Sequence, residues 1–258
     1  MLRFSANISM LFGEVDLLER FGVAARAGFK AVEIQYPYAL DRSWLARIAQ
    51  DAGVEVVLIN MPSGDPGKGD RGLGCLPSRI DEFRQGVAQA IEYAKALGCR
   101  QINCLAGIAP PGADGTKLRK TYVSNLRYAA GELARHGLTL LAEPISTQTV
   151  PGFFLNRSAQ ALELMDDVDA PNLKLQYDLY HAHLMGDDLA ATLEANLERI
   201  GHMQVADAPG RHEPGTGEID FRSLFSRIDA LGYGGWIGAE YIPGGKTEDG
   251  LAWAREYL

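Results

Sequence analysis

The chain contains little cysteine and no long apolar run. Only three of its 258 residues are cysteines, and this odd number leaves at least one thiol unpaired. A disulfide framework is therefore excluded, and we expect reduced thiols. No apolar run approaches the roughly 20 residues that a membrane-spanning helix needs. The chain also does not begin with a basic stretch that leads into a short apolar segment. We therefore expect a cytoplasmic protein with no membrane partner.

Positive charge is also scarce. Lysine and arginine number 25 against 33 aspartates and glutamates, which gives a net charge of −8. A protein that covers a nucleic-acid backbone presents a basic face, so this balance argues against a nucleic-acid partner. The 47% of hydrophobic residues excludes a disordered chain. An acidic protein can still bind a small anion, but it then needs a local basic residue or a metal ion.

Short β-rich runs alternate with helical patterns along the whole chain. Several of the runs are apolar without strict alternation, which is typical of strands buried on both faces of a parallel sheet. The predicted strands are Arg3–Ile8, Ala31–Tyr36, Val54–Asn60, Gln101–Leu105, Leu138–Glu143, Leu173–Asp178, His202–Ala206 and Trp236–Glu240.

The segments between these runs carry apolar residues at helical spacing. Ser43 is a candidate N-cap for the second of them, and glycines such as Gly53 and Gly98 stand where a helix ends and the next strand follows. The predicted helices are Asp16–Ala27, Trp44–Ala52, Ser78–Leu97, Leu118–His136, Ser158–Val168, Asp187–Ile200, Phe221–Leu231 and Thr247–Tyr257.

Eight strands and eight helices in strict alternation predict an α/β fold, a single (β/α)₈ TIM barrel over residues 1–258. A doubly wound open sheet is the alternative. The segment 61–77, MPSGDPGKGDRGLGCLP, follows the third strand and is long and rich in glycine. We expect it to be structureless and to act as a lid over a small substrate. It contains no P-loop, because GxxxxGK[ST] is absent.

Four consecutive predicted strands end in, or carry near their ends, an oxygen-bearing side chain. These are Glu143, Asp178, Gln204 and Glu240. The carboxyl ends of barrel strands meet on one face, so we expect these side chains to converge. Converging carboxylates repel unless a cation joins them, and oxygen ligands suit Mg²⁺ or Mn²⁺ better than Zn²⁺. Glu143 and Glu240 could also remove a proton and return it to the neighbouring carbon.

Each of these residues has a plainer interpretation. Asp178 could cap the helix that follows it, and Glu143 could be an exposed loop carboxylate. Gln204 could pair with a neighbouring backbone group. His202, on the same strand, fits a packed and hydrogen-bonded barrel histidine better than a ligand.

Two further residues are candidate binders of a substrate anion or hydroxyl. His181 follows Asp178 closely, and Arg211 lies on a loop rich in glycine and proline. There a guanidinium could grip a carboxylate with two parallel hydrogen bonds. A solvated loop arginine is the alternative for Arg211. Lys68 and Arg71, on the predicted lid, could contribute charge or could serve solubility alone.

Several stretches of the chain together resemble the hydroxypyruvate isomerase family, within the xylose-isomerase-like barrels. The resemblance covers essentially the whole chain, and the run that starts at Gly201 is long and specific. The stretches are FSANISMLFGEVDLLERF, INCLAG, AEPI around Glu143, YDLYHAH around Asp178 and His181, GHMQVADAPGRHEPGTGEIDF, and GAEY around Glu240.

The resemblance implies an isomerase that interconverts hydroxypyruvate and tartronate semialdehyde through an enediolate. In the family, the residues matching Glu143 and Glu240 are the acid/base pair. Those matching Glu143, Asp178, Gln204 and Glu240 hold Mg²⁺ or Mn²⁺, and those matching His181 and Arg211 lie near a sugar-acid substrate. The family's members often associate, so a homo-oligomer stays open.

Other functions remain alternatives on the same barrel. A subgroup resembles 2-oxotetronate isomerases, whose substrate is one carbon longer, and the departures YDLYHAH and AEPISTQ lie close to the site. A ketose 3-epimerase is another alternative. An endonuclease IV-like nuclease would need more histidine and a basic face. A binding protein without turnover would have no need of two glutamates.

Overall fold

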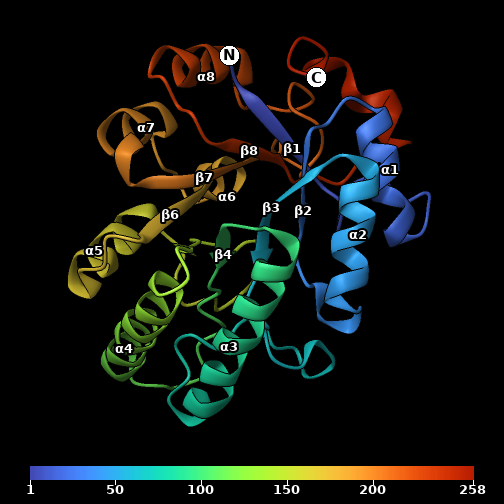
Figure 1. Ribbon diagram of the computed structural model, residues 1–258. Coiled ribbons are helices and arrows are strands. Elements are labelled where there is room, and N and C mark those ends of the chain that lie inside the picture. The colour runs from blue at the N-terminus through green and yellow to red at the C-terminus, as the bar shows by residue number, and fades with distance from the viewer.

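The computed structural model describes all 258 residues, and its eight strands close into a parallel barrel in sequence order from β1 to β8. Figure 1 shows the helices arranged around this barrel. The predicted α/β TIM barrel is therefore confirmed, and the open-sheet alternative is wrong. The strands are β1 Arg3–Asn7, β2 Ala31–Ile34, β3 Glu55–Asn60, β4 Gln101–Asn103, β5 Thr139–Ala142, β6 Leu173–Asp178, β7 Ile200–Val205 and β8 Trp236–Ala239.

The helices of the outer layer are α1 Leu17–Arg26, α2 Arg42–Ala52, α3 Ile80–Leu97, α4 Gly115–Ala134, α5 Ser158–Val168, α6 Leu179–Leu184, α7 Leu189–Asn196 and α8 Phe221–Ala230. An α-helix follows each of the first seven strands, and β6 is followed by two, α6 and α7. No helix is at once long and apolar enough to cross a bilayer.

Local chemistry sets several helix ends. Gly53 and Gly98 close α2 and α3 in the left-handed conformation, at φ of 71° and 66°, which a residue with a Cβ adopts only at a cost. The N-cap of α2 is Asp41, whose carboxylate accepts from the backbone N–H of Trp44 at 2.9 Å. The prediction that Ser43 caps this helix was wrong, because Ser43 already lies within it.

Two predicted helical segments differ in the structure. The segment that follows β8 forms a 3₁₀ helix over Thr247–Ala254 instead of an α-helix. The segment predicted as helix to Ile200 ends as an α-helix at Asn196, because a 3₁₀ turn over Leu197–Arg199 leads directly into β7. The short helix α6 directly after β6 was not predicted.

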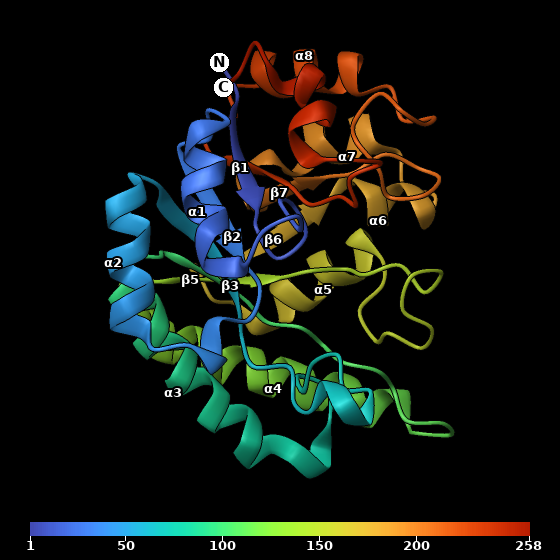
Figure 2. The same ribbon diagram turned by 90° about the vertical axis from the view of Figure 1, so that its right-hand side faces the viewer.

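The hydrophobic core is continuous through the barrel and its helices. The longer connections after β3, β4, β5 and β7 gather on one end of the barrel, on the right-hand side of Figure 2. This is the end at which the strands finish, and the polar side chains that the sequence singled out lie there.

Segment 61–77 belongs to this end and is partly ordered by hydrogen bonds. It contains a 3₁₀ turn over Pro66–Lys68, and Gly72 forms an antiparallel bridge with Ala106. The backbone N–H of Cys75 donates to the Ala106 carbonyl at 2.8 Å. The expectation of a structureless segment was therefore wrong. Its action as a lid stays a prediction.

Candidate active site

A cavity of about 100 Å³ opens at the C-terminal end of the barrel. Four of the predicted site residues line it: Glu143, His181, Arg211 and Glu240. The remaining two, Asp178 and Gln204, are buried opposite each other in the β6–β7 ladder. The full lining is Gln35, Tyr36, Asn60, Arg71, Leu105, Glu143, Ile145, Thr149, Val150, Phe153, His181, Arg211 and Glu240.

Glu143 directly follows β5 and is 5% exposed, so the exposed-carboxylate interpretation was wrong. Its Oε2 accepts a hydrogen bond from Nδ2 of Asn103 at 2.7 Å. Burial raises the pKa of Glu143 well above its ordinary range, and the carboxylates of Glu240 and Asp178 raise it further. The side chain is therefore held in one orientation in an environment that favours its protonated form.

Glu240 directly follows β8 and is equally buried. Its Oε1 accepts from Nδ2 of Asn7 at 2.9 Å and from Nε2 of Gln35 at 2.7 Å. Its Oε2 accepts from Nη2 of Arg211. Burial raises the pKa of Glu240 to about 7, with Arg211 opposing the shift and Asp178 and Glu33 adding to it.

Asp178 ends β6, and its two carboxylate oxygens have different surroundings. Oδ1 caps α6 by accepting from the backbone N–H groups of Tyr180 and His181 at 2.8 and 3.2 Å. Oδ2 is buried and accepts no hydrogen bond. Burial raises the pKa of Asp178 to about 6, and Arg211 opposes the shift. The helix-cap interpretation was therefore right, and it leaves the second oxygen free to serve the site.

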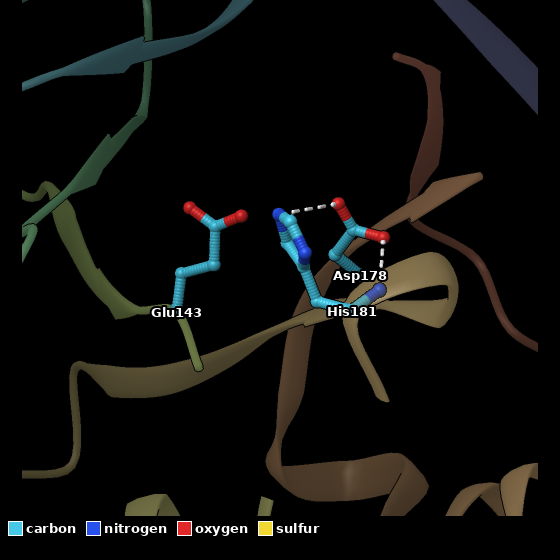
Figure 3. Close-up of side chains that lie close together, drawn as sticks. All are labelled: Glu143, Asp178 and His181. Atoms are coloured by element: carbon cyan, nitrogen blue, oxygen red, sulfur yellow. Dashed lines mark hydrogen bonds and ion pairs between the residues drawn. The ribbon is translucent and has the colours of Figure 1, made fainter. Parts of the chain in front are cut away.

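His181 lies between two of the carboxylates. Figure 3 shows its ring between the side chains of Glu143 and Asp178, and ligand atoms of these three residues all lie within 4.8 Å of one another. Nε2 of His181 is 3.6 Å from Oδ2 of Asp178, whereas Nδ1 is buried without a partner. Burial and the charge of Arg211 lower the pKa of His181 well below its usual value, so the imidazole is neutral.

Arg211 brings a positive charge to these acids. It lies on the connection after β7, and its backbone has φ of 59°. Its Nη2 donates to Glu240 and lies 3.6 Å from Oδ2 of Asp178. Burial lowers the pKa of Arg211, but Glu240, Asp178 and Glu143 more than offset this, and its pKa is raised. The solvated-arginine interpretation was wrong. Its buried Nε has no partner.

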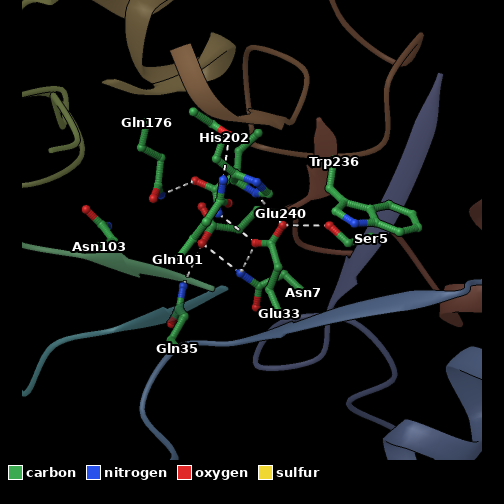
Figure 4. Close-up of polar contacts among 12 residues, drawn as sticks. Ser5, Asn7, Glu33, Gln35, Gln101, Asn103, Gln176, His202, Trp236 and Glu240 are labelled. Carbon is green, nitrogen blue, oxygen red and sulfur yellow. Dashed lines mark hydrogen bonds and ion pairs between the residues drawn. The ribbon is translucent and has the colours of Figure 1, made fainter. Parts of the chain in front are cut away.

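Figure 4 shows a buried polar network inside the barrel that includes Glu33, Gln176 and His202. Gln204 is hydrogen-bonded to two of its members. Its Nε2 donates to Oε2 of Glu33 at 2.8 Å, and its Oε1 accepts from Nε2 of Gln176 at 2.7 Å. Gln204 thus pairs with side chains, not with the backbone. His202 is fully buried with Nε2 2.7 Å from Oε1 of Glu33, as expected of a packed barrel histidine.

The chemistry of these side chains fits a divalent cation. Three ligand atoms converge, and the Oδ2 atom of Asp178 is a buried acceptor without a donor. Burial raises the pKa of Glu143, Asp178 and Glu240. A buried acceptor without a donor is costly, and an ion would supply its partner. The geometric cluster is Glu143, Asp178 and His181. The predicted ligands Gln204 and Glu240 lie outside this cluster. Gln204 is opposite Asp178 in the β6–β7 ladder, and Glu240 accepts a hydrogen bond from Arg211. Both are also hydrogen-bonded to other side chains.

Sequence reasoning missed two contributions. His181 was expected to bind substrate, although a histidine three residues after Asp178, in the first turn of a helix, can also turn back toward the same ion. Gln35 was not considered at all. It lies two residues after Glu33, and side chains at that spacing point to the same face of a strand, which was the signal that could have identified it.

The chain matches the xylose isomerase-like TIM barrel family over residues 21–257. It is 49% identical over 257 residues to hydroxypyruvate isomerase of Escherichia coli (strain K12), covering 100% of both chains. It is 42% identical over 258 residues to 2-oxo-tetronate isomerase of Pectobacterium atrosepticum, covering 100% of this chain and 98% of the other. The crystal structure of a Brucella melitensis protein named AP endonuclease, family 2, superposes with a TM-score of 0.97 at 44% identity, covering 100% of this chain and 99% of that one.

Proposed function

Because the chain belongs to the xylose isomerase-like TIM barrel family, we propose that it is a hydroxypyruvate isomerase, which interconverts hydroxypyruvate and tartronate semialdehyde. The observation that carries this proposal is the pair Glu143 and Glu240. Both are buried at strand ends, both line one small cavity, and each is held by an amide donor. The full-length similarity to hydroxypyruvate isomerases supports the same reaction.

The reaction needs a base and an acid at adjacent carbons. One glutamate takes a proton from the hydroxymethyl carbon of hydroxypyruvate, and the electron pair left behind forms the carbon–carbon double bond of an enediolate. A proton is then delivered to the former ketone carbon, while the hydroxyl proton passes from one oxygen to the other. A pKa of about 7 for Glu240 allows this residue both to hold and to release a proton near neutral pH.

We propose that Glu143, Asp178, Gln204 and Glu240 hold Mg²⁺ or Mn²⁺, since all four offer oxygen. The unpartnered Oδ2 of Asp178 supports an ion at this point. An ion held by these residues would supply Lewis acidity, which would offset the negative charge that develops on the substrate. Asn7, Gln35 and Asn103 orient the two glutamates through their hydrogen bonds.

We propose that His181 and Arg211 contact the substrate. Both line the cavity, and each has a buried ring or guanidinium nitrogen without a partner, Nδ1 of His181 and Nε of Arg211. Because the imidazole is neutral, it can donate to a substrate oxygen without adding charge. Nη2 of Arg211 is already engaged by Glu240, which leaves Nε and Nη1 for a hydroxyl or carbonyl oxygen.

A 2-oxotetronate isomerase is the second candidate. Relatives with that name are 42% and 43% identical to this chain over its full length, and the chemistry at the two reacting carbons is the same. The extra carbon changes only how well the substrate fits the cavity. One carbon more or less typically changes the binding free energy by about 1–3 kcal/mol. A ketose 3-epimerase has less support, because the relatives of 42% and 49% full-length identity are named as isomerases of sugar acids. A nuclease is disfavoured by the net charge of −8.

The proposed partner is a small sugar-acid molecule. A cytoplasmic location is part of the proposal and rests on the likeness to enzymes of small-molecule metabolism. Whether the protein forms a homo-oligomer stays open.

The test is to incubate the Mg²⁺- or Mn²⁺-loaded protein with hydroxypyruvate and, separately, with 2-oxotetronate in D₂O. Isomer formation is followed by NMR, and carbon-bound deuterium reports exchange of the transferred proton with solvent. We expect the hydroxypyruvate isomer to form with the higher kcat/KM. Faster turnover of 2-oxotetronate would favour the second candidate, and no isomer from either acid would exclude both.

A further inference from the structure

The charges around the cavity leave an anionic substrate without an obvious partner. Glu143, Asp178 and Glu240 are acidic, and Arg211 already pairs with two of these three. A sugar acid that enters this cavity brings a further carboxylate into it. The ion proposed above and Arg211 together offset the charge of these three acids. If the proposed function holds, a further positive side chain near the mouth of the cavity would offset the charge of the substrate carboxylate.

Arg71 also lines the cavity, at the tip of the connection that follows β3. Its only side-chain hydrogen bond is from Nη1 to the backbone carbonyl of its neighbour Asp70, at 2.8 Å. No carboxylate oxygen lies within 4.0 Å of its guanidinium, whereas Lys68 on the same tip pairs with Asp65 at 3.2 Å.

A specific arrangement keeps Arg71 unpaired. The Asp70 carboxylate would be its natural partner, but Oδ2 of Asp70 accepts from Nη1 of Arg79 at 2.6 Å and from the backbone N–H of Asp65 at 2.7 Å. Arg79 and the Asp65 N–H thus share one carboxylate oxygen of Asp70, and Arg71 forms no ion pair with this acid. Arg71 is exposed, and the other donors of its guanidinium have no hydrogen-bond partner in the protein.

The backbone at Arg71 is anchored. The N–H of the next residue, Gly72, donates to the Ser63 carbonyl at 3.0 Å. Gly72 has φ of 118°, and a Cβ there would meet the Leu105 carbonyl oxygen at 2.5 Å. Only glycine fits so close to the connection after β4, and this contact holds Arg71 at the cavity.

From these contacts we propose that Arg71 binds the substrate carboxylate and so selects sugar acids over neutral sugars. A guanidinium matches a carboxylate with two parallel hydrogen bonds. Arg211 serves the reacting oxygens deeper in the cavity, and Arg71 holds the charged end of the molecule. This inference rests on the proposed function for the identity of the substrate.

The test compares Arg71→Gln with Arg71→Lys and with the matched control Lys68→Gln, which removes the same charge from the same tip. For hydroxypyruvate we expect Arg71→Gln to raise KM about 10- to 100-fold and to leave kcat within about threefold. Inhibition by hydroxyacetone, in which a methyl group replaces the carboxylate, should stay unchanged. Arg71→Lys should recover part of the loss, and Lys68→Gln should behave as wild type.

If Arg71→Gln leaves the KM for hydroxypyruvate within twofold of wild type, the proposal is overturned. It is also overturned if Arg71→Gln weakens the binding of hydroxypyruvate and of hydroxyacetone equally. A third contradicting result is an equal rise in KM for Arg71→Gln and Lys68→Gln. Calorimetric binding of glycerate needs no turnover and separates this proposal from the proposed function. Glycerate affinity lost in Arg71→Gln supports Arg71 as the carboxylate binder, and retained affinity counts against it. A wild-type protein that binds glycerate but isomerises neither acid would refute the proposed function alone.

A second inference comes from the buried network of Figure 4. Glu33 on β2 is 1% exposed and accepts four hydrogen bonds. Ser5 Oγ and His202 Nε2 reach its Oε1 at 2.8 and 2.7 Å, and Gln204 Nε2 and Asn7 Nδ2 reach its Oε2 at 2.8 and 3.3 Å. Gly238 leaves room for this carboxylate, since a Cβ there would meet Oε1 at 1.9 Å.

We infer that Glu33 is a positioning residue that determines which end of the Gln204 amide is available to the ion. A carboxylate only accepts hydrogen bonds, so Gln204 must turn its NH₂ group toward Glu33. The Gln204 oxygen then lies at the other end, where it accepts one hydrogen bond from Gln176 and keeps one lone pair. Groups behind metal ligands typically change metal affinity 10- to 100-fold when they are removed.

The test is a calorimetric Mn²⁺ titration of Glu33→Gln, whose amide would let Gln204 turn over. We expect Mn²⁺ affinity to fall about 10- to 100-fold, while Ser5→Ala, which removes one donor to Glu33, stays within about threefold. In a Gln204→Glu background both ends of the side chain are oxygen, so Glu33→Gln should cost no further affinity. The same loss in both backgrounds would overturn the inference, and so would unchanged affinity in Glu33→Gln. Unchanged affinity in Gln204→Ala would also exclude Gln204 from the ligand set.

Discussion

Nη2 of Arg211 lies 3.6 Å from Oδ2 of Asp178, a buried oxygen that accepts no hydrogen bond. The same nitrogen donates to Glu240. The guanidinium therefore lies between two buried carboxylates and offsets part of their repulsion. An ion at Asp178 and a substrate at Arg211 would share these acids, so the binding of each depends on the other.

The first prediction concerns the two proposed acid/base residues. Glu143→Gln and Glu240→Gln should each lower kcat for hydroxypyruvate isomerisation by about 10²- to 10⁴-fold, because an amide cannot exchange a proton. The control Glu163→Gln changes an exposed glutamate on α5 and should keep full activity. Circular dichroism establishes that all three variants are folded. A near wild-type rate in either site variant would contradict the two-glutamate mechanism.

The second prediction concerns the divalent ion. Mg²⁺ or Mn²⁺ at about 100 times its dissociation constant should stabilise the folded protein by about 2.7 kcal/mol, because the ion neutralises acids that burial penalises. Thermal unfolding with chelator and with added ion measures this. In Asp178→Asn the ion-dependent shift should largely disappear. A melting temperature that is independent of the ion in wild type would argue against a site here.

The third prediction concerns pH. Burial raises the pKa of Glu240 in the folded state from its ordinary 4.5 to about 7. Below pH 4.5 the carboxyl is protonated in both the folded and the unfolded state, so its raised pKa costs no stability. Between pH 4.5 and pH 7 the loss of folding free energy grows, and above pH 7 it is complete. In the absence of metal, Glu240→Gln should therefore gain stability relative to wild type, by about 2 kcal/mol more at pH 8 than at pH 5. Urea unfolding at both pH values measures this difference, and a difference independent of pH would show that the folded-state pKa is not raised.

The fourth prediction concerns space around Glu33. Gly238→Ala places a methyl group 1.9 Å from Oε1 of Glu33, an atom held by buried donors, so the variant should be destabilised by about 1–3 kcal/mol. Gly131→Ala on α4 is the matched control. It has open space around it and should gain roughly 0.5–1 kcal/mol, because alanine favours helix. Equal stability of the two variants in urea would contradict the packing argument.

The fold could be predicted because hydrophobic periodicity and strand spacing are local signals that repeat around a barrel. Every strand was located within a few residues. The errors lie where tertiary contacts decide local structure. The segment after β8 has helical spacing but forms a 3₁₀ helix, and segment 61–77 has no periodicity yet pairs with Ala106.

For the candidate site, the sequence predicts only which side chains lie at the carboxyl ends of the strands. The convergence of Glu143, Asp178 and Glu240 follows from barrel geometry. Which group pairs with which does not, because it depends on side-chain length and loop path. Arg211 reaches Glu240 through a backbone at φ of 59°, and no sequence pattern indicates that the Gln204 amide faces both Glu33 and Gln176.

The most direct test of the account is a crystal structure of the Mn²⁺-loaded protein, with the ion located by anomalous diffraction. The account predicts one ion contacted by Glu143, Asp178, Glu240 and the amide oxygen of Gln204. An ion held by Glu143, Asp178 and His181 without Gln204 and Glu240, or no ion at this end of the barrel, would contradict it.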